Sequence, residues 1–246
     1  MRIPRIYHPE PLAMDTVVAL TAEAATHVAR VLRLRRSADV ILFNGEGGEF
    51  QATLESIERR SVTARIGAYV GRDVESPLEI VLAQGISRSE RMDYVVQKAV
   101  ELGVASIVPV VTEFCSVKLT QERLDKRQQH WQAIALSACE QSGRNRIPDC
   151  LVPTPLSIWL EGLESQDHEL RLVLDRNADL SIKSLTMPPR KVVLLIGPEG
   201  GLSDAEIQLA IKAGFTPLSL GPRVMRTETA AVAALACLQM LWGDFA

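Results

Sequence analysis

Hydrophobic and polar residues follow two different patterns along this chain, and the change falls near residue 78. From there onward, short apolar runs are separated by longer segments with apolar residues at helical spacing. Apolar runs that exchange regularly with helices are typical of a parallel α/β sheet covered on both faces. The predicted strands are 78–85, 104–111, the region near 150–153, 170–175, 191–197 and 215–221. The predicted helices are 91–103, 120–142, 156–163, a segment beginning near 203, and 230–243.

The first part of the chain has short alternating segments and one helical stretch. Residues 39–58 predict two strands around a glycine turn, and 61–70 predict a third. Short strands in so small a unit indicate a compact β-barrel. Segment 71–77 is polar, contains Gly and Pro, and predicts a linker. We therefore expect two domains, 1–73 and 74–246. A helix is expected over 21–34, with an apolar face made by Val28, Val31, Leu32 and Leu34.

Composition excludes several classes of protein. With 47% hydrophobic and 23% charged residues, the chain is typical of a soluble globular protein. No apolar run reaches the roughly 20 residues of a membrane span, and the first residues lack the apolar core of a signal peptide. The four cysteines are widely spaced and the four histidines show no ligand spacing. We therefore expect a cytoplasmic protein with no disulfide framework and no metal site.

Arginine is concentrated near the beginning of the chain. The first 73 residues carry ten arginines and no lysine, while the whole chain has a net charge of −3. The guanidinium fork suits phosphate oxygens and base edges, so this cluster is a candidate RNA contact; a solvated charged face is the alternative. The arginines concerned are Arg2, Arg5, Arg30, Arg33, Arg35 and Arg36.

Two similar bends follow the last two predicted strands. The first is GPEGG at 197–201 and the second is LGPRVMR at 220–226. Ligands of open parallel sheets sit beyond the carboxyl ends of the strands, and glycine permits close backbone approach. Neither bend matches a dinucleotide fingerprint or a nucleoside-triphosphate loop. The bends therefore predict a site for a polar ligand without a phosphate chain, or else two ordinary turns.

The residues around these bends also predict how the adjoining helices begin. Ser203 and Glu206 have the spacing of a capping box. Thr227 or Thr229 is a candidate cap for the last helix. That last helix is rich in alanine and apolar nearly all round, so we expect it to be buried within its own subunit or at a subunit interface.

The two bends, read together with other segments, resemble a known family. LLIGPEGGLSDAE at 194–206 and LGPRVMRTETAA at 220–231 are similar to the signature of the SPOUT RNA methyltransferases. MRIPRIYH at the start, QKAVELGV at 97–104 and ACEQSGRNRIP at 138–148 agree with the bacterial members that methylate N3 of one uridine in 16S ribosomal RNA. The similarity covers essentially the whole chain in the same order, without departure at the motif positions.

The resemblance implies a PUA-like β-barrel domain followed by an α/β domain with a C-terminal trefoil knot. It implies a homodimer that acts on the assembled small ribosomal subunit and binds S-adenosylmethionine in the knot. Glu199 is expected to contact the ribose hydroxyls or favour the sulfonium charge, or only to stabilise a helix start. The residues expected around the cofactor are Leu174, Ile196, Gly197, Glu199, Gly200, Gly201, Leu218, Leu220, Gly221, Val224, Met225 and Arg226.

The chemistry predicts a cation or a base beside the target. Uracil N3 carries a proton and is a poor nucleophile until that proton is lost. Arg226 is the expected cation, and Glu228 is either a base or a brace for Arg226 or the turn. Arg144 and Arg146 suit phosphate or a flipped base, although a helix C-terminus favours cations in any case. Arg88 follows another strand and is either a substrate contact or a loop charge.

Three other functions remain open on the sequence. A nicotinamide-dependent oxidoreductase is disfavoured because the dinucleotide fingerprint is absent. A non-catalytic RNA-binding assembly factor would explain the arginines but not the two bends. Methylation of a ribose 2′-oxygen is the nearest competitor, because related knotted enzymes catalyse it.

Overall fold

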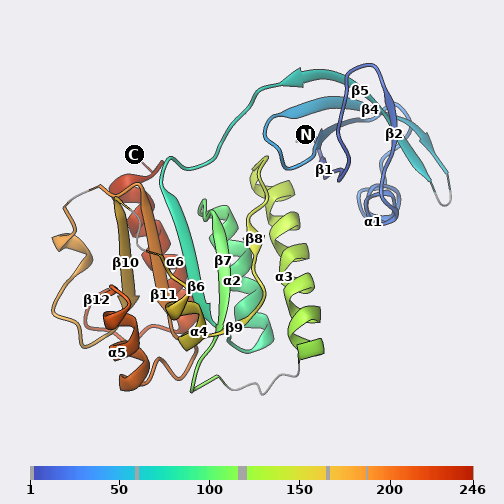
Figure 1. Ribbon diagram of the computed structural model, residues 1–246. Helices are drawn as coiled ribbons and strands as arrows, with labels where there is room; N and C mark the ends of the chain where they lie inside the picture. Colours follow the sequence, from blue (N-terminus) through green and yellow to red (C-terminus); the bar gives the residue numbers. More distant parts are fainter. Residues whose placement is uncertain (1–2, 59–60, 116–120, 165–166, 187, 246) are drawn as a thin grey trace. The chain divides into compact units, whose positions relative to one another are not determined.

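The computed structural model describes residues 3–58, 61–115, 121–164, 167–186 and 188–245 (Figure 1). The chain forms two compact units. The first contains residues 1–75 together with 139–147, and the second contains 76–138 and 148–246. Each unit is described by itself below.

The first unit is built on one five-stranded sheet with the strand order β1-β3-β4-β5-β2. β1 runs parallel to β3, and the other neighbours are antiparallel. Alternate residues of the long strands point into the core, including Leu54 on β4 and Ile66 on β5. The strands are β1 (Arg5–Tyr7), β2 (Val17–Ala19), β3 (Asp39–Phe43), β4 (Glu49–Ile57) and β5 (Val62–Val70).

The helical stretch of this unit is shorter and less regular than expected. Helix α1 (Ala22–Thr26) begins under a cap from the Thr21 hydroxyl and continues as one π-helical segment, His27–Val31. The expected apolar face is only partly confirmed, because Val28 is fully buried whereas Val31 is 66% exposed. The wider π turn rotates the side chains that follow, and Arg33 then takes a positive φ of 51°.

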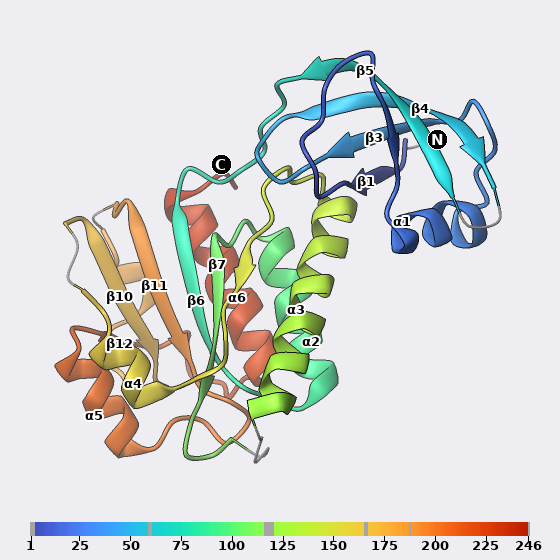
Figure 2. The same cartoon turned by 45° about the vertical axis from the view of Figure 1, so that its right-hand side comes forward.

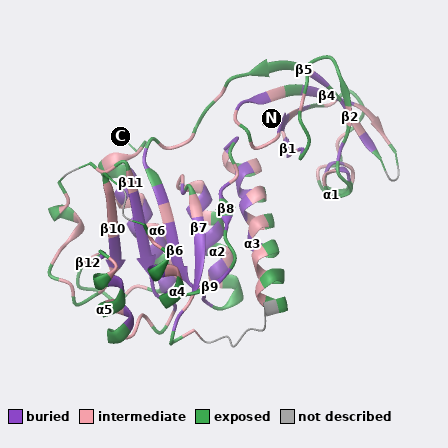
Figure 3. Cartoon of the chain, viewed as in Figure 1, coloured by how far each residue is buried: buried purple, intermediate pink, exposed green. Residues whose placement is uncertain are grey.

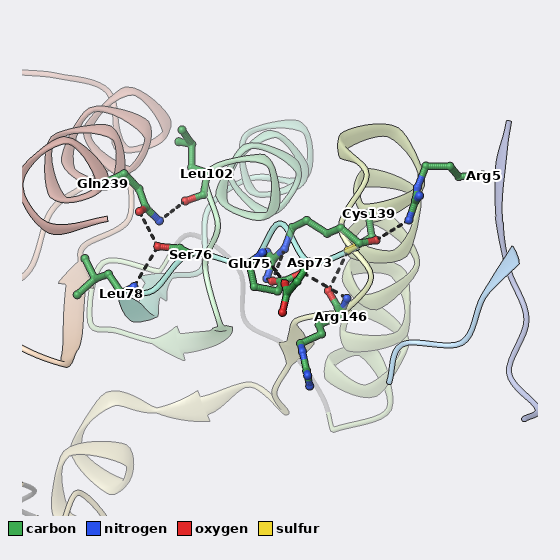
Figure 4. Close-up of polar contacts among 10 residues, drawn as sticks. Arg5, Asp73, Glu75, Ser76, Leu78, Leu102, Cys139, Arg146 and Gln239 are labelled. Atoms are coloured by element: carbon green, nitrogen blue, oxygen red, sulfur yellow. Dashed lines mark hydrogen bonds and ion pairs between the residues drawn. The ribbon is translucent and has the colours of Figure 1, made fainter. Parts of the chain in front are cut away.

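A buried polar network ties residues 139–147 into the first unit. Arg5 pairs with Glu49 and also donates to the Asn145 side chain and the Arg144 carbonyl oxygen. Arg144 pairs with Glu75, with 2.9 Å between Nε and Oε2. Figure 4 shows Glu75 beside Arg146, whose backbone N–H also donates to that carboxylate. Arg144 and Asn145, just after the long helix, are therefore buried within the first unit.

The same segment carries a thiol with little reactivity. Cys139 is fully buried, and burial raises the pKa of its thiol to about 12, against the opposing effect of the nearby Arg144 charge. A thiol with such a high pKa stays protonated near neutral pH and is a poor nucleophile.

The second unit is a parallel sheet, as the alternation of strands and helices predicted. Its order is β12-β10-β11-β6-β7-β8, with β9 also paired to β7, and every pairing is parallel (Figure 2). The strands are β6 (Glu79–Gly85), β7 (Ser106–Val111), β8 (Asp149–Cys150), β9 (Thr154–Pro155), β10 (Glu169–Leu174), β11 (Lys191–Ile196) and β12 (Thr216–Leu218).

Helices cover both faces of this sheet, so its central strands are buried almost throughout (Figure 3). α4 and α5 lie over the face that carries Val193 and Leu195 of β11, while α2 and α6 pack together on the opposite face (Figures 1 and 2). The helices are α2 (Ser89–Glu101), α3 (Gln121–Ser142), α4 (Leu156–Glu161), α5 (Asp204–Lys212) and α6 (Thr227–Trp242), with a 3₁₀ turn at Ile182–Ser184.

The ends of two of these helices are joined. α2 ends before Gly103, whose φ of +77° supplies the expected left-handed stop. Near the end of α6, the Gln239 side chain donates to the Leu102 carbonyl oxygen at 2.8 Å and accepts from the Ser76 hydroxyl at 2.7 Å (Figure 4). A buried amide at 0% exposure thus fixes the chain entering the sheet to the end of the last helix.

α6 is less buried than its composition suggested. One face is covered, but Met240 is 66% exposed and Leu241 is 42% exposed in the single chain. Across the described ranges, no helix is both long and apolar enough to cross a membrane. The same ranges contain no group of three or more His, Cys, Asp or Glu arranged to hold a metal ion.

Arg144→Ala should destabilise the protein much more than Arg146→Ala. Arg144 is 5% exposed and paired, so its removal leaves the Glu75 carboxylate partly buried without its partner, whereas Arg146 is exposed. We expect a loss of about 3 kcal/mol in the free energy of unfolding for Arg144→Ala, and less than about 0.5 kcal/mol for Arg146→Ala. Urea denaturation of both variants measures the difference, and equal losses would contradict the structural role of Arg144.

Candidate functional site

The second unit contains a cleft at the carboxyl ends of β10, β11 and β12. Its volume is about 410 Å³, and both glycine bends contribute to its walls. A cavity of this size suits a small organic ligand, for which sites typically measure roughly 300–1,000 Å³. The position is the one that the parallel sheet predicts for ligand binding.

The first bend leaves β11 and turns sharply within a few residues. The Gly201 N–H donates to the Pro198 carbonyl oxygen at 2.9 Å, and Gly201 has a φ of +75°. A Cβ atom on Gly197 would lie 2.7 Å from the carbonyl carbon of Gly201. Because that neighbour is backbone, only glycine fits at 197 without opening the bend.

The second bend is held against the end of β10. The Asp175 N–H donates to the Leu218 carbonyl oxygen at 3.0 Å, and the Ser219 N–H donates to the Leu180 carbonyl oxygen at 2.8 Å. Gly221 then takes a φ of +116°, with its N–H bonded to the Ser219 hydroxyl at 3.2 Å. The connection after β10 and the connection after β12 therefore lie side by side.

The side chain of a fully buried glutamine is hydrogen-bonded to residues of the first bend and of the helix start after the second bend. Gln84, at the end of β6, is 0% exposed; its side-chain amide donates to the Thr227 hydroxyl at 2.9 Å and to the Gly197 carbonyl oxygen at 3.3 Å. Thr227 in turn donates to the same carbonyl oxygen at 2.7 Å. The end of β6, the first bend and the start of α6 thus share one hydrogen-bonded cluster.

The two expected helix caps have different outcomes. The capping box of Ser203 and Glu206 is confirmed, and Glu206 also accepts the Glu113 N–H at 2.8 Å. The expected cap of the last helix by Thr227 or Thr229 is wrong. Arg226 occupies the N-cap position without a side-chain cap, and the hydroxyl of Thr227, one residue into the helix, donates to the Gly197 carbonyl oxygen instead.

A small cluster of charges lies beside the first bend. The Glu199 carboxylate accepts the Arg88 backbone N–H at 3.0 Å and pairs with Arg91 at 3.3 Å. Arg91 Nε also lies 3.9 Å from Glu228 Oε1. Burial raises the pKa of Glu199, but backbone hydrogen bonds and the arginine charges outweigh it, so the net pKa is lowered and the group is an anion at neutral pH. Glu228 therefore lies beside Arg91, and among the described residues no ion pair joins it to Arg226.

The structure brings the expected cofactor residues together. All of them except Arg226 line the cleft; Arg226 is exposed and comes between the lining residues Met225 and Thr227. The lining residues among the predicted set are Leu174, Ile196, Gly197, Glu199, Gly200, Gly201, Leu218, Leu220, Gly221, Val224 and Met225.

Several lining residues were not expected from the sequence. Asp175, Arg176 and Asn177 follow β10 directly and line the cleft. The rule that sites form at strand ends already covered them, because their strand was predicted correctly. Thr227 and Arg223 line it as well, whereas no sequence signal pointed to Arg91 beside it.

The predicted RNA-contacting arginines fall into two groups. Arg5 is 7% exposed and Arg144 is 5% exposed, and both are held in the network of the first unit, so the structure gives them an interior setting and not an RNA-facing one. Arg2 lies outside the described residues. The exposed members are Arg30, Arg33, Arg35, Arg36, Arg88 and Arg146.

Two of the exposed arginines line a groove in the first unit. Arg35 and Arg36 border a hollow of about 860 Å³ whose other walls include Val17, Leu34 and Thr63, together with the acidic residues Glu55 and Glu58. Open space beside two neighbouring guanidinium groups is a suitable setting for a phosphate backbone.

Family models match both units. A model described as an RNA methyltransferase domain matches residues 74–239, and one described as an RNA methyltransferase PUA domain matches residues 20–67. The cleft at the ends of a parallel sheet and the preceding five-stranded unit therefore define an RNA methyltransferase with a PUA domain.

Individual relatives cover nearly the whole chain. The ribosomal RNA small subunit methyltransferase E of Buchnera aphidicola (strain Sg) is 36% identical, covering 99% of this chain and 98% of the relative. The protein of the same name from Bacillus subtilis is 27% identical over 92% of each. This chain belongs to the family of the ribosomal RNA small subunit methyltransferases E.

Solved structures agree with this assignment. A ribosomal RNA small subunit methyltransferase E from Neisseria gonorrhoeae, bound to S-adenosyl methionine, superposes with a TM-score of 0.92 at 40% identity and full coverage of both chains. A Legionella pneumophila structure solved with the bound cofactor SAM superposes with a TM-score of 0.95 at 43% identity, again with full coverage. The fold described above is thus the fold of that family, with its PUA-like first domain.

Thr227→Val should destabilise the second unit, although it hardly changes the volume of the side chain. The substitution removes the hydroxyl that bonds the Gly197 carbonyl and the Gln84 amide, all within a buried cluster. We expect a loss of about 2 kcal/mol in the free energy of unfolding. The matched control is Thr229→Val on the exposed side of the same helix turn, with an expected change below about 0.5 kcal/mol. Chemical denaturation tests the pair, and a Thr227→Val variant as stable as its control would disprove the role of the cluster.

Proposed function

We propose that this protein transfers a methyl group from S-adenosylmethionine to N3 of one uridine in 16S ribosomal RNA of the assembled small subunit. The observation that carries this proposal is the cleft formed by two glycine bends at the ends of β10, β11 and β12. The family of the chain and the cofactor named for its solved relatives support the choice of reaction and ligand.

The residues of the cleft fit such a cofactor. A Cβ atom added to Gly201 or Gly221 would meet nothing within 4 Å, so a ligand has room against the backbone of both bends. Apolar side chains from all three strand ends, including Leu174, Ile196 and Leu218, offer surfaces for an adenine ring. The backbone groups of the bends hold the polar parts of the ligand, and no phosphate-binding lysine is needed.

The protein's own contribution to the reaction is positioning and charge. Bound S-adenosylmethionine supplies an electrophilic methyl group on its sulfonium. Arg226, at the rim, stabilises the uracil anion that forms when N3 loses its proton. It forms no ion pair with any residue in the described part of the chain, so its charge is available to the substrate. Glu228, which lies beside Arg91, is the candidate acceptor of the proton that uracil N3 loses.

We assign RNA recognition to the exposed arginines. Arg35 and Arg36 line the groove of the first unit, and Arg30 and Arg33 precede them on the same exposed stretch. Arg88 and Arg146 extend the set. Base pairing in a duplex hides N3, so the target uridine must be unpaired when it enters the cleft.

Two further features follow from the family and complete the proposal. The exposed apolar residues of α6, with Met240 and Leu241 foremost, form part of a homodimer interface. The connection after β10 and the connection after β12 are joined by a hydrogen bond from the Ser219 N–H to the Leu180 carbonyl oxygen. These two connections form part of a trefoil knot. The protein works on ribosomes in the cytoplasm.

The central experiment uses small ribosomal subunits from cells that lack this gene. Purified protein and methyl-labelled S-adenosylmethionine are added, and the product is mapped by reverse-transcription stops. A methyl group on N3 blocks base pairing, so we expect one strong stop at a single uridine that depends on the cofactor. Label without a stop would indicate a ribose 2′-oxygen or another position. Binding without label would favour an assembly factor.

Arg226→Ala should separate cofactor binding from turnover. The side chain lies outside the cleft lining, so we expect an unchanged Kd for S-adenosylmethionine and a kcat lower by roughly 100-fold. Arg190→Ala, at the amino end of the same sheet, serves as the control. Calorimetry and single-turnover assays give the two quantities, and equal losses in both would remove the catalytic assignment.

The double variant Arg35→Glu, Arg36→Glu should weaken binding to the small subunit and flatten its salt dependence. Each lost phosphate contact lowers the slope of log K against log salt by about 0.7 to 0.9. Filter binding across a salt series measures the slope, with the double variant Arg123→Glu, Arg190→Glu at two exposed positions as the control of equal net charge. If the slope of log K against log salt is the same for the double variant as for the wild type, these arginines are not part of the RNA interface.

A further inference from the structure

One guanidinium group lies between the two bends of the cleft. Arg91, near the start of α2, has Nη1 at 3.3 Å from Glu199 Oε1 and Nε at 3.9 Å from Glu228 Oε1. Glu199 is at the apex of the first bend, and Glu228 is in the first turn of the helix that ends the second bend. A residue of a third element therefore contacts the apex of the first bend and the first turn of α6, which follows the second bend.

The first contact is firmly anchored. The Glu199 carboxylate accepts the backbone N–H of Arg88, which is the N-cap residue of α2 and has no side-chain cap of its own. Glu199 thus acts as the carboxylate of a capping box does, but from a distant part of the chain. The apex of the first bend is held to the start of α2 by one hydrogen bond and one ion pair.

The second contact joins α2 to α6, which pack together along their length. The side chain of Glu228 is 16% exposed, and its Oε2 atom is buried without a hydrogen-bond partner within the described structure. Its neighbour Thr227 lines the cleft and bonds to Gly197. A shift of Glu228 is therefore transmitted directly to the cleft wall.

Stability of α2 does not explain an arginine at this position. The first turn of a helix carries partial positive charge, so a cation there is unfavourable for the helix itself. Ion pairs at 3.3 and 3.9 Å on a side chain that is 36% exposed add little to folding. The arrangement is better suited to setting the position of two carboxylates that would otherwise repel each other.

We propose that Arg91 is a positioning residue that holds the two bends of the cleft together by neutralising Glu199 and Glu228. The inference rests on the proposed function, because the bends are taken to enclose S-adenosylmethionine. Without the guanidinium group, both carboxylates lose their ion pair at the junction of α2 and α6, and only the backbone N–H and the charge of Arg88 still act on Glu199. The apex of the first bend and the start of α6 then separate, and the cleft binds its ligand less well.

The test measures the affinity for S-adenosylmethionine by calorimetry in the full-length protein. We expect Arg91→Gln to weaken binding roughly tenfold, while its melting temperature stays within about 2 °C of the wild type. Arg91→Lys keeps the charge and should retain most of the affinity. The added substitution Glu228→Gln in the Arg91→Gln protein should restore affinity to within about threefold, because one of the repelling charges is gone. High salt should also reduce the defect of Arg91→Gln.

Arg123→Gln is the matched control, since Arg123 is also an arginine in the first turn of a helix, α3, but is exposed, and this variant should bind as the wild type does. Equal affinity of Arg91→Gln and the wild type would overturn the inference alone. So would a defect that Glu228→Gln fails to repair, because the loss would not then come from repulsion. A wild-type protein that does not bind S-adenosylmethionine would overturn the proposed function itself.

Discussion

The carbonyl group of Gly197 is the point on which the cleft depends. It directly follows the central strand β11 at a buried position, where an unpaired carbonyl oxygen is costly. The Thr227 hydroxyl and the Gln84 amide both donate to it. Three elements far apart in sequence therefore have to meet at one oxygen atom, and the bends on either side of the cleft take their positions from that meeting. The glycine itself is required because the backbone of Gly201 leaves no room for a side chain.

The regular elements were predictable because their signals are local. Apolar runs marked the strands of the parallel sheet, Gly103 marked the end of α2, and the capping box of α5 was present as expected. The position of the cleft followed from the rule for strand ends, and the resemblance supplied its ligand. The helix near residue 28 was predicted too long, since its π-helical turn depends on packing and not on periodicity.

The roles of individual polar residues were harder to predict. Charge is visible in a sequence, but burial is not: Arg5 and Arg144 look like their exposed neighbours and instead lie in the interior of the first unit. Thr227 is of a residue type that commonly caps helices, but its hydroxyl donates to the carbonyl oxygen of Gly197, which follows another element. Arg91 gave no signal at all, because both of its partners are more than 100 residues away. Such contacts depend on the completed sheet, while the knot and the dimer remain predictions of the family resemblance.

The composition of the first unit has a consequence for the synthesis of the chain. This unit includes residues 139–147, among them the buried Arg144 and the Asn145 side chain, which accepts a hydrogen bond from Arg5. Domains generally fold in the order in which they leave the ribosome, the N-terminal one first. Here Arg5 of the N-terminal sheet can form its hydrogen bonds to Arg144 and Asn145 only after the long helix α3 has been synthesised. Folding of the two units is therefore interleaved in time, and the first unit is completed only after more than half of the chain has been translated.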